Sequence, residues 1–208
     1  MPPNKGSSRR WQRRQARDPY VERAAREGWR SRAAFKLIEI DSRERLLKPG
    51  ATVLDLGAAP GGWSQVAARR VGPRGRVLAI DCLPMDPIAG VDFLEADFES
   101  EPARQWLSGR IGEPGVDLVL SDLAPNISGN RAIDQPRSMA LVEAAVEIAG
   151  EVLNPGGAFL TKLFQGEGQR EFEQGLTSRF GRIKRLKPKA SRPESREIYL
   201  LACDYRIM

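Results

Sequence analysis

Residues 53–63 read VLDLGAAPGGW, a short apolar run followed by a turn that contains Gly57, Gly61 and Gly62. A strand, a glycine-rich turn and the start of a helix form the junction at which α/β proteins bind ligands. Glycines in such a turn let a ligand approach the backbone closely. No Gly-Lys-Ser/Thr follows, so the turn is not a P-loop, and Ala59 and Pro60 depart from the GxGxxG dinucleotide motif. We expect the turn to hold a nucleoside without phosphates.

Further apolar runs alternate with helical patterns along the rest of the chain. The expected strands are residues 51–57, 75–81, 91–97, 116–122 and 158–164, and the expected helices are 31–47, 61–72, 136–153 and 171–180. Ser31 is the expected N-cap of the first helix. Short apolar strands separated by helices indicate an α/β fold with a Rossmann-like, doubly wound, mostly parallel sheet. Residues 182–188 and 196–205 are expected to add an antiparallel edge strand near the C-terminus.

A polar residue ends or follows the apolar part of each parallel strand. These residues are Asp55, Asp81, Asp97, Asp122 and Lys162. Each alone is more often a turn former or a helix cap. Together they would line one rim, because ligands bind at the carboxyl ends of parallel strands. Asp81 is placed to accept hydrogen bonds from ribose hydroxyls, Asp97 could meet an adenine amino group, and Lys162 needs a compensating charge because lysine is rarely buried.

The net charge of +6 is unevenly distributed. Residues 1–36 hold eleven Lys or Arg and three Asp or Glu, and residues 181–197 hold seven and two. Basic segments on a near-neutral body indicate a polyanionic partner, and Trp11 and Tyr20 could stack on bases. The alternative is a solubilising tail. We therefore expect a basic, flexible N-terminal arm over residues 1–29, disordered to about residue 18, and one catalytic domain over residues 30–208.

The composition excludes several classes of chemistry and location. The chain has no histidine, which removes Ser-His-Asp and Cys-His catalysis and histidine as a general base. Cys82 and Cys203 are too few for a disulfide scaffold, and a core role is expected for both. No run approaches the roughly 20 apolar residues of a membrane helix, and the N-terminus lacks the apolar core of a signal peptide. A cytoplasmic protein is expected.

Five blocks of the sequence resemble one family. The blocks are SRAAFKL (31–37), DLGAAPGGWSQ (55–65), SDLAPNISG (121–129), TKLFQG (161–166) and SRPESREIYLL (191–201). They resemble the FtsJ/RrmJ (RlmE) family of S-adenosylmethionine-dependent RNA 2′-O-ribose methyltransferases, from about residue 30 to residue 205. The resemblance implies a methyltransferase-type sheet, S-adenosylmethionine as cofactor and no metal. It implies a catalytic tetrad and a set of cofactor contacts: Lys36, Asp122, Lys162 and Glu197 for the tetrad, and Gly61, Trp63, Asp81, Asp97 and Asp122 for the cofactor.

The resemblance also implies a substrate and a partner. The substrate would be a uridine ribose in 23S-type large-subunit ribosomal RNA, at the peptidyl-transferase A loop, and the enzyme would be a monomer acting on the large subunit. A methyltransferase for transfer RNA or an mRNA cap is the nearest alternative. A nicotinamide-dependent oxidoreductase is disfavoured by the first turn, and a non-catalytic RNA-binding protein is disfavoured by the intact tetrad.

In the implied reaction, Lys162 acts on the ribose 2′-hydroxyl that receives the methyl group. A hydroxyl needs a base within hydrogen-bond reach. Burial and a second cation, Lys36, favour a neutral Lys162 that acts as this base, whereas Asp122 and Glu197 favour a charged amine that stabilises developing negative charge. Without the resemblance, Lys36 and Glu197 would be interpreted as surface residues. The Trp63 side chain could be a core aromatic or could lie near the methionine part of the cofactor, and residues 126–137 are expected to form a long polar connection that acts as a lid or contacts RNA.

Overall fold

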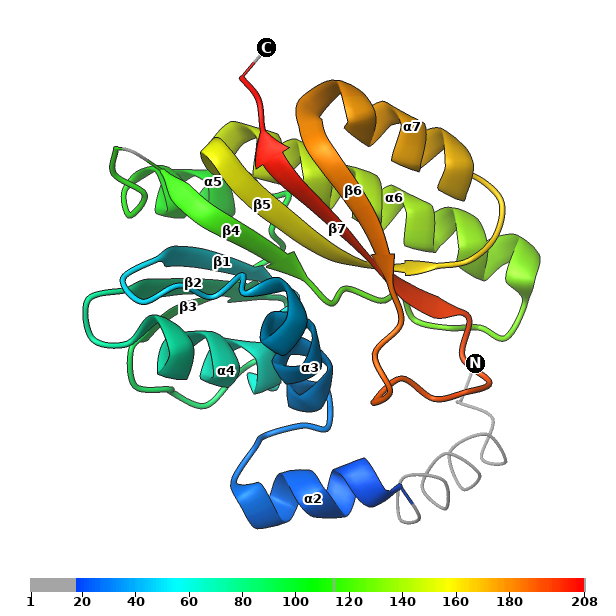
Figure 1. The fold of residues 1–208 in the computed structure, drawn as a ribbon, viewed down its shortest axis with the longest axis horizontal. Helices are drawn as coiled ribbons and strands as arrows, with labels where there is room; N and C mark the ends of the chain where they lie inside the picture. The colour runs from blue at the N-terminus through cyan, green and yellow to red at the C-terminus, as the bar shows by residue number, and fades with distance from the viewer. Residues whose placement is uncertain (1–17, 114, 208) are drawn as a thin grey trace.

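A computed structural model describes residues 18–113 and 115–207. Seven strands form one sheet in the order β3-β2-β1-β4-β5-β7-β6 (Figure 1). The strands are β1 (Thr52–Leu56), β2 (Arg76–Asp81), β3 (Val91–Glu95), β4 (Val116–Ser121), β5 (Leu153–Phe164), β6 (Phe180–Leu186) and β7 (Glu197–Tyr205). Strands β1 to β5 are parallel, and β7 pairs antiparallel with both β5 and β6. The predicted fold, with its antiparallel strands near the C-terminus, is confirmed.

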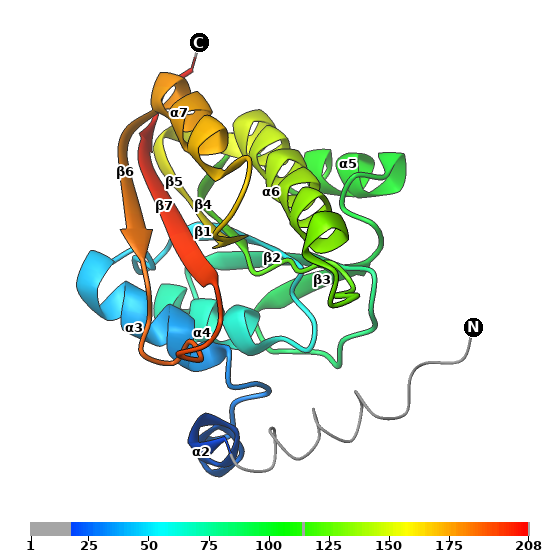
Figure 2. The same cartoon turned by 90° about the vertical axis from the view of Figure 1, so that its right-hand side faces the viewer.

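Helices cover both faces of this sheet (Figure 2). The helices are α2 (Pro19–Glu27), α3 (Ala34–Glu44), α4 (Gly62–Val71), α5 (Glu101–Ser108), α6 (Arg131–Val152) and α7 (Gln169–Arg179). One layer contains α3 and α4, and the opposite layer contains α5, α6 and α7. None of the helices formed by the described residues is long and apolar enough to cross a membrane.

Strand β1 shows how the sequence divides its residues between the two layers. Val53 packs with α3 and α4, whereas Leu54 and Leu56 pack with α5 and α6, because successive side chains of a strand point to opposite faces. Both faces are therefore apolar, as expected for a parallel strand buried on each side. Asp55 is the exception, since this carboxyl side chain is fully buried.

The long helix α6 begins earlier than the sequence indicated. The spacing of its apolar residues placed the expected helix at residues 136–153. In the structure the Asn130 side chain caps α6 by accepting from the Ala132 amide at 3.1 Å, and Asp134 accepts from the Ser128 and Gly129 amides at 2.8 and 3.0 Å. These bonds satisfy free amides at the helix start, so Pro136 lies inside the helix. The polar connection after β4 is therefore shorter than the expected 126–137 segment.

Other element boundaries also differ from the expectation. The first expected helix begins at Ala34 without a side-chain cap, so the prediction of Ser31 as its N-cap is wrong. Helix α5 was not predicted, although Ser100 caps it and Pro102 lies in its first turn. Strand β5 begins at Leu153, where residues 154–157 were expected to end the preceding helix.

Helix α2 lies in the segment that the sequence assigns to the arm. Asp18 caps this helix and pairs with Arg32, which precedes α3, and with Arg192, which follows β6, the latter at 3.4 Å. Ala24 packs with Phe35 of α3. Residues 19–27 are thus attached to the catalytic domain, whereas the predicted disorder of residues 1–17, including the proposed stacking of Trp11, lies outside the described residues.

Candidate active site

The direction in which successive strands are added to the sheet reverses between β1 and β4. From β1 the sheet extends through β2 to β3, and from β4 it extends through β5 in the opposite direction. The helix after β1 and the helix after β4 cover opposite faces, and this is the position at which open α/β sheets form a ligand crevice, outside the carboxyl ends of the two strands. The expected rim of polar residues meets this crevice.

The glycine-rich turn after β1 requires two of its glycines. Gly57 has φ +76°, and a Cβ atom there would lie 2.6 Å from Leu123 Cδ2. Gly61 has φ +107° and caps α4, where a Cβ would lie 2.6 Å from Ile88 Cδ1. The first amides of α4 have no partner within the helix and face the turn. Both glycines are therefore required by their backbone conformation and by the close side chains of Leu123 and Ile88, and the first amides of α4 are left as donors.

Asp81 and Asp97 follow this turn across the sheet. Asp81 ends β2 and accepts hydrogen bonds from the Ala59 amide at 2.9 Å and the Leu83 amide at 2.8 Å. The carboxylate thus fixes the turn, and its remaining lone pairs are available to ribose hydroxyls. Asp97 is exposed two residues beyond β3, and one of its oxygens accepts from the Glu99 amide at 3.0 Å. The second oxygen of Asp97 is left for a ligand.

Asp55 occupies an unusual place beneath the same turn. Its Oδ2 accepts from the Ser64 hydroxyl at 2.6 Å, whereas its Oδ1 is buried without a partner among the described residues. Burial raises the pKa of Asp55 to about 7. The negative charges of Asp122 and Asp81 act in the same direction, and the Ser64 hydrogen bond acts against them. The sequence placed Asp55 on the rim, but the fold places it in the floor of the crevice.

Lys162 lies just beyond the last pair of β4 and β5. That pair joins Ser121 to Thr161, so Lys162 is the first residue of β5 to extend past β4. Its Nζ is 3.1 Å from Asp122 Oδ1 and donates to the Asp122 carbonyl at 2.6 Å. Lys162 is only 8% exposed, and β5 continues for two residues beyond it. The lysine is therefore inside a strand yet faces the rim, which explains its position in an apolar run.

Lys36 and Glu197 form the second half of the cluster. Lys36 projects from the first turn of α3, and its Nζ is 2.8 Å from Glu197 Oε1 at the start of β7. Lys36 also donates to the Tyr199 hydroxyl at 3.0 Å, and that hydroxyl donates to Asp122 Oδ1 at 2.9 Å. One hydrogen-bonded chain thus joins all four tetrad residues through Tyr199.

The two ammonium groups keep the carboxylates of this chain ionised. Burial raises the pKa of Asp122, but the charges of Lys162 and Lys36 outweigh it and hold the pKa below its ordinary value. Burial opposes ionisation of Glu197 as well, and Lys36 lowers the pKa of Glu197 in the same way. Burial, with the negative charges of Asp122 and Glu197, raises the pKa of Tyr199 well above its ordinary value. Tyr199 therefore remains a neutral donor between two charged neighbours.

Tyr199 is the site residue that the sequence reasoning missed. It lies two residues after Glu197 in β7 and pairs with Lys162 of β5. Strand alternation therefore puts Glu197, Tyr199 and Lys162 on one face. This alternation, applied to the EIY of residues 197–199, was the signal that could have identified the tyrosine.

The Trp63 side chain belongs to the core. Trp63 is 3% exposed, its indole Nε1–H donates to the Ala33 carbonyl at 2.9 Å, and its ring packs on Tyr199 with centroids 5.7 Å apart. A ligand contact at residue 63 would therefore come from the backbone amide in the first turn of α4. Among the described residues, no group of three or more His, Cys, Asp and Glu side chains is placed to hold a metal ion.

Comparisons with known proteins agree with this geometry. The FtsJ-like methyltransferase family matches residues 29–205. A solved Plasmodium falciparum protein, described as a ribosomal RNA methyltransferase, shares 29% identity with a TM-score of 0.78, over 85% of this chain and 98% of that chain. A Clostridium thermocellum protein described as an rRNA methylase, at 19% identity and a TM-score of 0.52 over 82% of this chain and 95% of that chain, shows the same fold. Because the family match spans most of the residues and confirms the resemblance of the five sequence blocks, the chain belongs to the FtsJ-like methyltransferase family.

Proposed function

We propose that this enzyme methylates the 2′-hydroxyl of a uridine ribose in 23S-type large-subunit ribosomal RNA, at the peptidyl-transferase A loop. The observation that carries the proposal is the hydrogen-bonded chain of Lys36, Tyr199, Asp122 and Lys162 at the carboxyl ends of β4 and β5. The Plasmodium falciparum relative, described as acting on ribosomal RNA, supports the choice of RNA. We propose that the target is a single uridine and that the enzyme acts on the assembled or assembling large subunit.

The crevice suits S-adenosylmethionine as the methyl donor. When bound, this cofactor supplies a methyl group that is already activated by a sulfonium. The turn after β1 offers close backbone approach at Gly57 and Gly61, and it lacks the features of a phosphate-binding loop. Asp81 and Asp97 at the ends of β2 and β3 offer acceptors for the ribose and the adenine. These residues together fit the nucleoside part of this cofactor.

Lys162 is proposed as the group that takes the proton from the ribose hydroxyl. Its amine lies at the rim of the sheet, where the Asp122 carbonyl and carboxylate fix its direction. A base must lie within hydrogen-bond distance of the hydroxyl, and a fixed direction removes much of the entropy of reaching that geometry. To act as a base, Lys162 first releases its ammonium proton to solvent. Its lone pair then takes the ribose proton as the hydroxyl attacks the methyl group, and this proton passes to solvent after the transfer.

The other members of the chain position Lys162. Asp122 accepts from both Lys162 and Tyr199, so its carboxylate is held from two sides. Lys36 donates to Tyr199 and pairs with Glu197, which links α3 to β7 across the site. Because each donor already faces a matching acceptor, the cluster needs little rearrangement when the ribose arrives.

The basic segments are proposed to hold the RNA. Residues 181–197 include β6 and the loop that leads to Glu197, so cations in this loop lie beside the tetrad. In the described part of the arm, the Arg23 guanidinium of α2 lies over the ring of Phe35 in α3, the helix that carries Lys36. Contacts between these cations and phosphates would make binding strongly dependent on salt.

One assay tests the proposed function. The protein is incubated with labelled S-adenosylmethionine in separate reactions with bare ribosomal RNA, large subunits from a methylation-deficient strain, transfer RNA or capped mRNA, and the modified nucleoside is identified. Label in 2′-O-methyluridine supports the proposal, whereas label found only in transfer RNA or at an mRNA cap rejects the ribosomal assignment. The Lys162→Ala variant should retain cofactor affinity and lose turnover by about 100-fold or more, as expected for loss of a general base. Full activity of this variant would reject the base role.

A further inference from the structure

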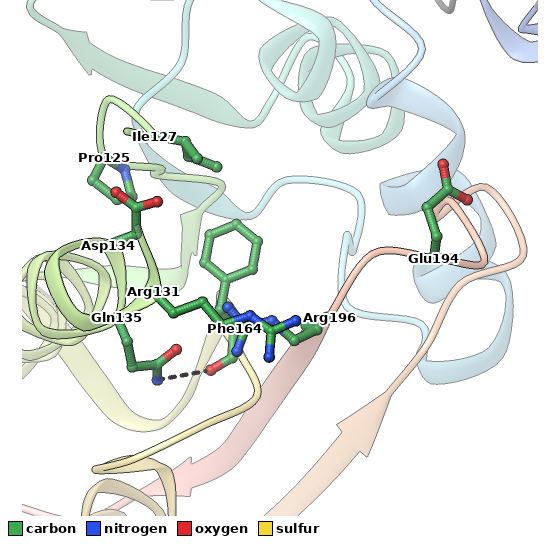
Figure 3. Close-up of a pocket in the computed structure, with 8 residues that line it drawn as sticks. All are labelled: Pro125, Ile127, Arg131, Asp134, Gln135, Phe164, Glu194 and Arg196. Carbon is green, nitrogen blue, oxygen red and sulfur yellow. Dashed lines mark hydrogen bonds between the residues drawn. The ribbon is translucent and has the colours of Figure 1, made fainter. Parts of the chain in front are cut away.

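A cavity of about 170 Å³ lies beside the tetrad and is not used by the proposed chemistry. Its walls include Pro125 and Ile127 after β4, Arg131 and Gln135 of α6, Phe164 at the end of β5, and Arg196 before β7 (Figure 3). Cofactor-sized pockets are generally about 300 Å³ or larger. This cavity is thus suited to a single ring system.

The cavity lies two residues beyond Lys162 along β5. Phe164 follows Lys162 by two residues on the same face and pairs directly with Glu197 of β7. Two residues of a strand span about 7 Å. A nucleotide whose ribose meets Lys162 would therefore place a neighbouring base close to Phe164.

The floor of the cavity is preformed. The Gln135 side-chain amide donates to the carbonyls of Phe164 at 3.2 Å and Glu167 at 3.0 Å. A Cβ at residue 166 would lie 2.6 Å from Gln135 Cδ, so Gly166 is needed for this close approach. The two donated bonds fix which end of the amide is oxygen, and Gln135 Oε1 has no partner among the described residues. Gln135 thus ties the end of β5 to α6 and fixes this wall of the cavity.

Two guanidinium groups at this cavity lack carboxylate partners. Within residues 18–113 and 115–207, neither Arg131 nor Arg196 forms an ion pair, and Arg196 donates only to the Gln165 carbonyl at 3.0 Å. Asp134 also lines the cavity, but its oxygens accept from Ser128 and Gly129, which lowers its pKa. Figure 3 shows Glu194 apart from both arginines. The cavity therefore joins an aromatic ring to two cations that are available to a phosphate.

We propose that this cavity is a subsite for an unpaired base that flanks the methylated nucleotide, with Phe164 stacking on the base and Arg131 and Arg196 binding its phosphate. Aromatic rings and arginines are the groups with which proteins bind single-stranded RNA. The inference rests on the proposed RNA substrate, and it adds a recognition site distinct from the tetrad and from the crevice at Asp81.

Binding of a fluorescein-labelled single-stranded RNA 12-mer, followed by anisotropy, tests the subsite without requiring turnover. Phe164→Leu keeps an apolar side chain and removes the ring, and Arg131→Gln removes one cation. Phe164→Leu should weaken binding by about 5- to 100-fold, the range for removal of a stacking side chain. Arg131→Gln should weaken binding and lower its dependence on salt, because one phosphate contact is lost. Arg74→Gln, an exposed charge at the opposite end of the sheet, is the matched control and should change affinity by less than about twofold. Equal binding by Phe164→Leu, Arg131→Gln and the control would overturn the subsite.

A second measurement separates this inference from the proposed function. Ribosomal RNA is methylated with each variant under conditions in which S-adenosylmethionine affinity is unchanged, and loss of the subsite should raise KM for RNA with little change in kcat. If the wild type methylates RNA and the variants match it in KM, the subsite is rejected and the function stands. If the wild type methylates no RNA, the function is rejected, and the 12-mer experiment alone decides whether the cavity binds RNA.

Discussion

The buried carboxyl of Asp55 should make the free energy of unfolding depend on pH. Its pKa lies at about 7 in the folded protein, compared with an ordinary value of 3.8. The folded chain therefore binds this proton more tightly than the unfolded chain does. Between pH 4 and pH 7 the folded state carries the extra proton, so the contribution of Asp55 to stability falls as the pH rises through this range.

The magnitude follows from the displacement of the pKa. One pKa unit corresponds to 1.36 kcal/mol, so a displacement from 3.8 to about 7 corresponds to about 4 kcal/mol. An Asp55→Asn variant has the same shape and no charge at any pH. It leaves an unpaired amide N–H where Oδ1 now lies, but that cost does not change with pH. The stability of the variant relative to wild type should therefore rise by about 4 kcal/mol between pH 4 and pH 8.

Urea denaturation at a series of pH values, followed by tryptophan fluorescence, measures this difference. Asp86→Asn, at an exposed position on the loop after β2, is the matched control, and its difference from wild type should stay constant. A constant difference for Asp55→Asn as well would show that Asp55 is ionised across the range. Such a result would mean that water or a cation reaches the unpaired oxygen, and the reasoning about the floor of the crevice would be refuted.

The remaining predictions concern the hydrogen-bonded chain, the turn and the arm. Tyr199→Phe removes the hydroxyl between Lys36 and Asp122, so it should lower kcat while changing cofactor affinity little. It should also lower the free energy of unfolding by about 1–3 kcal/mol, because two buried partners lose a hydrogen bond. Steady-state kinetics and denaturation measure both effects, and an unchanged kcat would show that Tyr199 has no role in the site. Gly57→Ala should lower the free energy of unfolding by about 1–2 kcal/mol, because alanine is strained at φ +76°. It should also weaken S-adenosylmethionine binding in calorimetry, since a Cβ would meet Leu123. Normal affinity would contradict the proposed close approach of the cofactor to this backbone. Deletion of residues 2–17, which keeps Asp18 as the cap of α2, should weaken RNA binding and flatten its salt dependence. An unchanged slope of log K against log salt would leave these residues without a role in binding.

Local pattern was enough to predict the fold class. Apolar runs such as VLDL and VLAI (residues 53–56 and 77–80) are too short for helices and are separated by helical segments, and this spacing requires a parallel sheet. Helix boundaries were less predictable, as at α6, which begins at the Asn130 cap and not at residue 136. Capping bonds depend on backbone angles that a sequence pattern does not specify.

The sequence by itself determined the alternation of strands and helices and the polar residues at strand ends, and through its resemblance to a family it proposed Lys36, Asp122, Lys162 and Glu197. Only the tertiary structure decided how these residues are connected. Tyr199 bridges Lys36 and Asp122, from which it is separated by 163 and 77 residues, and no local pattern encodes such a contact. The same holds for Asp55, whose pKa depends on burial by the whole sheet, and for Trp63, whose side chain packs on Tyr199 in the core. Burial and hydrogen bonding between distant segments exist only once the chain has folded, because they depend on which strands become neighbours.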